Sequence, residues 1–316
     1  GMPVLLGELT DEQLRAFDVA VLSPGVPTDL PVVLKMKEKE IPVIGEVELA
    51  YQVSRGKVLA ITGTNGKTTT TSLLGEIMKA YQPEVKVVGN IGTPYTSAAL
   101  DTTDDTVTVA EISSFQLETA VHFHPTVSAI LNITPDHLNR HHTMENYAAV
   151  KESITKNQTK DDFCVLNHED SWLKAFAPKC PAQVIWFSSK EKLERGYYLV
   201  GSKICRNLGN GEEVLLDVDE MQLIGVHNFE NVMAAIAIAA AYGVPMETIL
   251  DTVKHFQAVE HRIEYVATKN GVVYYNDSKG TNPDAAIQAI RAMKWPTVLI
   301  GGGYDKQNTY DEWIEA

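Results

Sequence analysis

The chain of 316 residues is 44% hydrophobic and 22% charged, and its formal net charge is −14. This composition is typical of a globular protein with more than one domain, and the negative charge disfavours nucleic acid and membranes as main partners. Three widely spaced cysteines without a Cys-x-x-Cys pair predict a reducing, cytoplasmic setting and no disulfide framework. The longest apolar run, residues 232–242, is too short to span a bilayer.

Residues 18–45 have the pattern of one strand–helix–strand unit. The strand predicted over 18–27 ends in a Pro/Gly turn. The helix predicted over 29–40 has Asp29 as its cap and Pro31 in its first turn. A second strand follows this helix. One such unit is too small for a domain, because most of its sheet is missing.

From residue 57 onward, strand and helix patterns alternate, which indicates an α/β protein with a mostly parallel sheet. The stretch after residue 183 is richer in strands, and a helix is predicted over 228–242. The pattern over 271–303 predicts one more strand–helix–strand unit, with its second strand at 297–303.

The stretch GTNGKTT (63–69) joins an apolar strand to a helix. Successive backbone N–H groups in such a turn can point at one anion, and the helix N-terminus adds positive potential. Lys67 is predicted to reach the outer phosphates of a nucleotide, and Thr68 is predicted to offer its hydroxyl to Mg²⁺. The loop is shorter than the common G-x-x-x-x-G-K-[ST] pattern because its first glycine is absent. The predicted nucleotide-binding residues are Gly63, Thr64, Asn65, Gly66, Lys67, Thr68 and Thr69.

Two more polar side chains follow predicted strands. Glu111 closes the strand TVTVAE, at the strand end where α/β sheets bind ligands, and its carboxylate suits Mg²⁺. His137 follows the strand SAILNI, and we expect it to contact a ligand or substrate. The histidines at 122, 124, 141 and 142 have no closed zinc-ligand spacing, so we expect ordinary surface or turn roles for them.

Several stretches together resemble the Mur ligases, most closely the branch that adds D-glutamate. The motifs are GTNGKTT (63–69), GNIGTP (89–94), EISSFQLE (111–118), NITPDHLNRH (132–141), YAAVK (147–151), HNFENVMAA (227–235), EHRIE (260–264) and NDSKGTNPDA (276–285). This resemblance covers nearly the whole chain and implies an α/β fold of three parts. A central P-loop ATPase domain (53–258) with a mostly parallel sheet would lie between partial Rossmann-like domains, an N-terminal UDP-binding remnant (1–52) and a partial C-terminal ligase domain (259–316).

The resemblance implies an ATP-dependent ligase of peptidoglycan precursor synthesis. Such an enzyme joins D-glutamate to UDP-N-acetylmuramoyl-L-alanine through an acyl phosphate and is a cytoplasmic monomer in the family. It implies two Mg²⁺ sites, one at Thr68 and Glu111 and one near His137 and Lys151. Lys151 occupies the position where the family carries a carbamylated lysine, which would hold Mg²⁺ as an anion. The implied catalytic residues are Lys67, Glu111, His137 and Lys151.

The resemblance also assigns binding residues. Asn228 and Asn231, three apart at a helix start, would surround the adenine. Arg262 would face the phosphates, and Asp277 the ribose. The residues that it assigns to the other substrates are Ser23 and Asn90 for the uracil nucleotide, Ser113 for substrate, Lys279 and Thr281 for the reacting groups and D-glutamate, and Lys306 for the glutamate.

Relative to the family, both ends are expected to be truncated, and the two incomplete sheets are expected to leave exposed edges through which copies could associate. Two alternatives therefore remain open. The chain could be a catalytically weak nucleotide-binding remnant, or it could be another ligase of the Mur or folylpolyglutamate type. The short loop and the acidic chain give little support to a generic P-loop ATPase coupled to motion.

Overall fold

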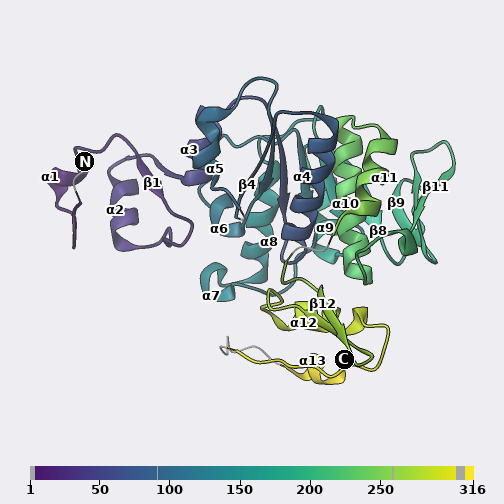
Figure 1. Cartoon of the computed structure of the whole chain (residues 1–316). Helices are drawn as coiled ribbons and strands as arrows, with labels where there is room; N and C mark the ends of the chain where they lie inside the picture. The colour runs from purple at the N-terminus through teal and green to yellow at the C-terminus, as the bar shows by residue number, and fades with distance from the viewer. Residues whose placement is uncertain (1–3, 91, 258–259, 304–309) are drawn as a thin grey trace.

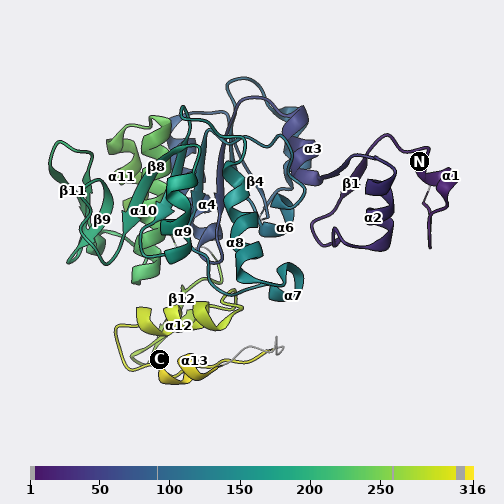
Figure 2. The same cartoon turned by 180° about the vertical axis from the view of Figure 1, so that it is seen from behind.

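The computed structural model centres on a nine-stranded sheet with helices on both faces (Figures 1 and 2), and it describes residues 4–90, 92–257, 260–303 and 310–316. Its strands are β3 (Lys57–Thr62), β4 (Val85–Gly89), β5 (Val107–Glu111), β6 (Val127–Ile130), β7 (Phe163–Asn167), β8 (Gln183–Ser188), β9 (Gly196–Val200), β10 (Lys203–Asn207) and β11 (Glu212–Asp217). They lie in the order β11-β10-β9-β8-β7-β6-β3-β5-β4. Neighbours from β4 to β9 are parallel, and β10 and β11 are antiparallel. The predicted mostly parallel α/β sheet is therefore confirmed.

The two faces of the sheet build two separate apolar clusters, because successive side chains of a strand point to opposite sides. In β3, Leu59 and Ile61 belong to the first cluster, whereas Val58 and Ala60 belong to the second. The helices that pack into the first cluster are α4 (Lys67–Tyr81), α10 (Val226–Tyr242) and α11 (Met246–His255). Those that pack into the second are α3 (Glu46–Val53), α5 (Tyr95–Ala98), α6 (Ser114–Leu117), α8 (Met144–Glu152) and α9 (Ser171–Phe176), and α7 (Leu138–His141) precedes α8.

The most apolar helix, α10, is fully buried along residues 232–239. It ends at Gly243, whose left-handed conformation (φ 104°) suits a residue without a side chain. Within the part of the chain that the structure describes, we find no helix whose length and apolar character would let it cross a membrane.

The N-terminal segment contains α1 (Asp11–Leu14), β1 (Ala20–Leu22), α2 (Pro31–Glu38) and β2 (Val43–Gly45). The parallel pairing of β1 with β2 confirms the predicted strand–helix–strand unit. The predicted cap of α2 is wrong, because the cap position belongs to Leu30 and no side chain caps the helix there. Pro31 begins the helix, and the residue before a proline is held in an extended conformation, here with ψ 142°.

Helix α3 joins the apolar cluster of the central sheet, although it also contacts β1 and β2. Val47 and Ala50 are buried in the second apolar cluster. The fully buried Glu48 carboxylate accepts hydrogen bonds from three backbone N–H groups at residues 121–123, at 2.8 to 3.1 Å. The boundary near residue 52 stays a prediction, and this packing favours a boundary before Glu46.

The C-terminal segment contains β12 (Glu264–Lys269), β13 (Val272–Asn276), α12 (Pro283–Ala292) and α13 (Asp311–Glu315). The strand–helix–strand unit predicted here is wrong: β13 pairs antiparallel with β12, and residues 297–303 form no strand. An apolar run becomes a strand only where a neighbouring strand supplies hydrogen bonds. The side chains of Val298 (91% exposed) and Ile300 (95% exposed) face solvent.

Candidate nucleotide and magnesium site

The loop between β3 and α4, residues 63–69, is called the phosphate loop below. Gly66 caps α4 in the left-handed region, with φ 85° and ψ −13°. A Cβ atom on Gly66 would lie 2.1 Å from Oδ1 of Asn231, and one on Gly63 would lie 3.0 Å from Cβ of Leu131. The loop therefore requires Gly66 both for its backbone angle and for the close approach of α10.

A second loop, which follows β6, holds the phosphate loop in place. The N–H of Thr64 donates to the carbonyl of Asn132 at 2.9 Å, and the N–H of Asn65 donates to Oδ1 of Asn132 at 2.8 Å. The hydroxyl of Thr64 lies 3.1 Å from the carbonyl of Thr134 and 3.1 Å from the hydroxyl of Tyr147. Asn132 and Tyr147 are absent from the predicted site residues, although Asn132 follows a strand end just as His137 does.

Two lysine side chains converge on one carbonyl of the phosphate loop. Nζ of Lys67 donates to the carbonyls of Gly63 and Thr64, both at 2.9 Å, and Nζ of Lys151 donates to the same Gly63 carbonyl at 2.7 Å. Lys151 is buried, with its Nζ 4.7 Å from the ring centroid of Tyr147. Burial lowers the pKa of Lys151 well below its ordinary value, and the Lys67 cation lowers it further. Burial also lowers the pKa of Lys67.

Glu111, at the end of β5, is a buried acid with one unpaired oxygen. Its Oε1 accepts from Nδ2 of Asn90 at 2.9 Å, whereas its buried Oε2 has no hydrogen-bond partner among the described residues. A buried carboxylate oxygen without a donor is costly, and a hard cation would satisfy it. Thr68, in the first turn of α4, is also buried. The unpaired oxygen of Glu111 is therefore a ligand of the kind that Mg²⁺ prefers.

The described residues form no metal cage by themselves. Over the described ranges, no three His, Cys, Asp or Glu side chains are grouped so that they could hold a metal ion. Any Mg²⁺ at Glu111 would complete its shell with phosphate oxygens and waters, as this ion commonly does.

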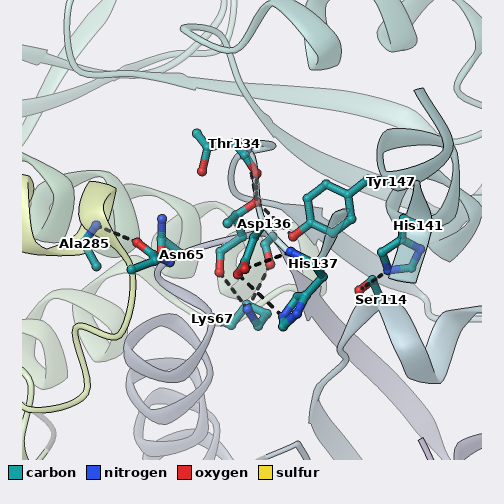
Figure 3. A network of polar contacts seen from close by, with 12 residues as sticks. Asn65, Lys67, Ser114, Thr134, Asp136, His137, His141, Tyr147 and Ala285 are labelled. Atoms are coloured by element: carbon teal, nitrogen blue, oxygen red, sulfur yellow. Dashed lines mark hydrogen bonds and ion pairs between the residues drawn. The ribbon is translucent and has the colours of Figure 1, made fainter. Parts of the chain in front are cut away.

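Figure 3 shows His137 and Asp136 beside Lys67. His137 has a left-handed backbone (φ 52°), and its Nε2 lies 3.5 Å from Oδ2 of Asp136. Its ring centroid lies 4.8 Å from that of Phe115. Asp136 raises the pKa of both lysines, which places its charge close to the phosphate loop. Asp136 was not predicted, although it directly precedes His137.

The expectation of a surface or turn role is wrong for His141. This side chain is buried, and its Nε2 lies 3.0 Å from Oγ of Ser114. Its ring packs between those of Phe115 in α6 and Tyr147 in α8, at centroid distances of 5.7 and 5.2 Å. His141 supports the site without facing it.

The start of α10 adjoins the phosphate loop. Asn228 and Asn231 are both buried, and Nδ2 of Asn231 donates to Oδ1 of Asn228 at 3.3 Å. The Arg262 cation lowers the pKa of Lys67 and of His227, so it lies near both. Its Nε is buried without a partner among the described residues. Burial is the main cause that lowers the pKa of His227 to about 4.

The C-terminal segment also reaches the phosphate loop. Nδ2 of Asn65 donates to Oδ2 of Asp284 at 2.7 Å, and Nδ2 of Asn282 donates to Oδ1 of Asn65 at 3.1 Å. The structure thereby brings the predicted stretch that holds Lys279 and Thr281 toward the phosphate loop. Asp284 and Asn282 were not predicted, although both lie within the motif NDSKGTNPDA.

For the remaining predicted residues, the structure shows no hydrogen bond or ion pair with the phosphate loop among the described residues. Oδ1 of Asp277 accepts from the N–H of Ile263 at 3.0 Å. Ser113 caps α6 in a capping box with Gln116. Ser23 is exposed and follows β1 in the N-terminal segment, and Lys306 lies outside the described residues. The structure does not bring Ser23 to the phosphate loop.

Comparisons with known proteins agree with these motifs. The family model Mur ligase middle domain matches residues 61–239. The UDP-N-acetylmuramoylalanine–D-glutamate ligase of Lachnoclostridium phytofermentans is 62% identical over 99% of this chain and 69% of its own length. The same-named protein of Lachnospira eligens is 59% identical over 99% of this chain and 70% of its own length.

Solved structures share the fold. MurF ligase from Thermotoga maritima, in complex with ADP, has a TM-score of 0.59 and 18% identity over 88% of this chain and 73% of its own. A UDP-N-acetylmuramoyl-L-alanyl-D-glutamate–2,6-diaminopimelate ligase has a TM-score of 0.61 and 20% identity over 92% of this chain and 72% of its own. At 18% and 20% identity, these similarities show a shared fold alone. Together with the family model and the close relatives, it leads to one conclusion: the chain belongs to the Mur ligase family.

Proposed function

We propose that this chain joins D-glutamate to UDP-N-acetylmuramoyl-L-alanine while ATP is converted to ADP and phosphate. The observation that carries the choice of substrates is the 62% identity, over 99% of the chain, to a relative named for this ligation. The geometry supports the ATP-dependent half, because the phosphate loop, the unpaired Glu111 oxygen and the start of α10 meet at one end of the sheet.

The nucleotide would bind along the phosphate loop and the start of α10. Lys67 now bonds to carbonyls of its own loop, so it would turn from them toward the β- and γ-phosphates. Arg262, whose Nε lacks a partner among the described residues, would add a second cation at the phosphates. Asn228 and Asn231 would contact the adenine, and Asp277 the ribose.

Glu111 and Thr68 would hold one Mg²⁺, and His137 with Lys151 would hold a second. The ions would offset the negative charge of the phosphoryl oxygens. The lowered pKa of Lys151 favours its neutral amine, which can attack CO₂ so that an N–C bond forms and one proton leaves. The resulting carbamate would place an anion suited to Mg²⁺ beside the loop.

The reaction then needs two displacements. An oxygen of the UDP-sugar carboxylate bonds to the γ-phosphorus while the bond to ADP breaks, which gives an acyl phosphate. The amine of D-glutamate attacks the acyl carbon, loses a proton and expels phosphate. Lys67 would stabilise the charge on the transferred phosphoryl group, and Lys279 and Thr281 would position the D-glutamate.

The other substrate contacts belong to the same proposal. Ser23 and Asn90 would contact the uracil nucleotide, Ser113 the rest of that substrate, and Lys306 the glutamate. We also propose a cytoplasmic monomer with domains at 1–52, 53–258 and 259–316, the first boundary being placed before Glu46 if α3 is assigned by its packing.

Phosphate release from Mg·ATP tests the proposal. Release should require both UDP-N-acetylmuramoyl-L-alanine and D-glutamate, and L-glutamate, L-alanine or L-lysine should not replace D-glutamate. Lys67→Ala should abolish release with the fold intact, whereas Lys79→Ala, at an exposed position of the same helix, should not. Release with L-lysine would assign the chain to another ligase branch, and nucleotide binding without any release would favour a non-catalytic remnant.

A further inference from the structure

The side chain of Asn65 projects from a fixed point of the phosphate loop. The backbone N–H of Asn65 donates to Oδ1 of Asn132 at 2.8 Å, and its carbonyl accepts from Nδ2 of the same residue at 3.1 Å. Both backbone polar groups are thereby satisfied by one amide on the loop after β6. The side-chain amide of Asn65 remains available for a different partner.

That partner is the first turn of α12, and both halves of the Asn65 amide are used. Oδ2 of Asp284 accepts from Nδ2 of Asn65 at 2.7 Å, a short distance that is typical of a charge-assisted hydrogen bond. Nδ2 of Asn282 donates to Oδ1 of Asn65 at 3.1 Å, while Oδ1 of Asn282 caps α12 through the N–H of Ala285. Figure 3 shows Ala285 beside Asn65. These bonds join residues 217 and 219 positions apart.

The loop between β13 and α12 is thereby anchored at both ends. At its start, Oδ1 of Asp277 accepts from the N–H of Ile263 at 3.0 Å, and the N–H of Lys279 donates to the carbonyl of His261 at 3.1 Å. At its end, the bonds to Asn65 fix α12 against the phosphate loop. The positions of Lys279 and of its neighbour Thr281 relative to the phosphate loop depend on both anchors.

We propose that Asn282 and Asp284 are positioning residues that latch the C-terminal segment onto the phosphate loop through Asn65. The latch couples the conformation of that loop to the docking of the segment. Since coupling between two equilibria is reciprocal, nucleotide bound to the loop strengthens docking, and a docked segment strengthens nucleotide binding. The docking part stands on the contacts alone, and the coupling part rests on the proposed nucleotide binding.

Amide hydrogen exchange of residues 264–292, measured without nucleotide, tests the docking. Asp284→Ala and Asn65→Asp should each speed exchange in this segment about tenfold, since each removes the charge-assisted hydrogen bond. Asn65→Asp also places a second carboxylate next to that of Asp284, so the two repel each other. Arg291→Ala, an exposed change on the same helix, should leave exchange unchanged. Exchange of α10 in each variant reports whether the central sheet is still folded.

The decisive variant is the double change Asn65→Asp with Asp284→Asn. It exchanges donor and acceptor: the amide introduced at position 284 can donate to the carboxylate introduced at position 65, and Asn282 can donate to the other oxygen. Slow exchange should therefore return in the double variant. If the single variants acted only by disturbing packing, the double variant would exchange at least as fast as they do. Exchange in the double variant as fast as in Asn65→Asp, or unchanged exchange in Asp284→Ala, would overturn the latch.

The coupling is tested by calorimetric titration with Mg·ADP. Asp284→Ala should weaken Mg·ADP binding several-fold, whereas Arg291→Ala should not. Equal Kd values for Asp284→Ala and the unmodified chain would overturn the coupling. Failure of the proposed ligation would leave the exchange measurement untouched, since that measurement uses neither nucleotide nor substrate.

Discussion

Replacing Gly66 with alanine tests the geometry of the phosphate loop at its tightest point. A residue with a side chain at φ 85° costs about 1–2 kcal/mol. The new Cβ would lie 2.1 Å from Oδ1 of Asn231, so Asn231 must turn away and lose its bond to Asn228, which costs about 1 kcal/mol more. The total of about 2–3 kcal/mol corresponds to a Tm lower by about 5–10 °C.

The same strain should appear in nucleotide affinity. If the loop relieves the strain by leaving its binding conformation, the Kd for Mg·ADP rises roughly 30- to 150-fold, which calorimetric titration can measure. Gly201→Ala is the matched control, because Gly201 has φ 60° with open space around it, so only the backbone cost applies and the affinity stays unchanged. Adding Asn231→Ala removes the clash and should recover part of the lost stability. A Gly66→Ala variant with unaltered Tm and Kd would refute the reasoning.

Three further predictions concern buried titratable side chains. Glu111→Gln removes the unpaired carboxylate oxygen, so the Tm measured without Mg²⁺ should stay the same or rise. The Mg²⁺ concentration needed for half-maximal nucleotide binding should rise about tenfold or more. An unchanged Mg²⁺ requirement would contradict the assignment of Glu111 as a Mg²⁺ ligand. Lys151→Met should abolish any CO₂-dependent mass increase of the folded chain and any CO₂-dependent gain in turnover, and persistence of either would place the modification elsewhere. His227 stays neutral in the folded chain because its pKa is lowered from 6.5 to about 4, whereas the unfolded chain takes up this proton below about pH 6.5. Stability should therefore fall by about 2–3 kcal/mol between pH 6.5 and 4, and His227→Gln should flatten this part of a denaturant-unfolding profile against pH.

Local sequence patterns were sufficient for the phosphate loop and for the position of Glu111. A strand that runs into glycines and a lysine, followed by a helix, leaves few other conformations for residues 63–69. Glu111 was identifiable because carboxyl ends of parallel strands meet at one edge of the sheet. The same rule also applies to Asn132 and Asp136, which lie just beyond β6, yet their roles depend on which loop they face.

Long-range contacts explain what the sequence could not predict. The hydrogen bond between Asn65 and Asp284 joins residues 219 positions apart, and the periodicity of the local sequence cannot predict such a contact. The apolar run 297–303 has strand character, but the described residues place no strand beside it, so its composition alone misled the prediction. His141 was misassigned for a related reason, since its burial results from contacts with Ser114, Phe115 and Tyr147, which are distant in local pattern.

The identity of the product decides whether the chain catalyses this ligation. The chain should be incubated with Mg·ATP, UDP-N-acetylmuramoyl-L-alanine and D-glutamate. The molecular mass of the UDP-sugar should then be measured by mass spectrometry. The UDP-sugar should gain one glutamyl residue, with one ADP and one phosphate formed for each, and L-glutamate should give no such product. Conversion of ATP without a heavier UDP-sugar, or an equal product from another amino acid, would contradict the proposed ligation.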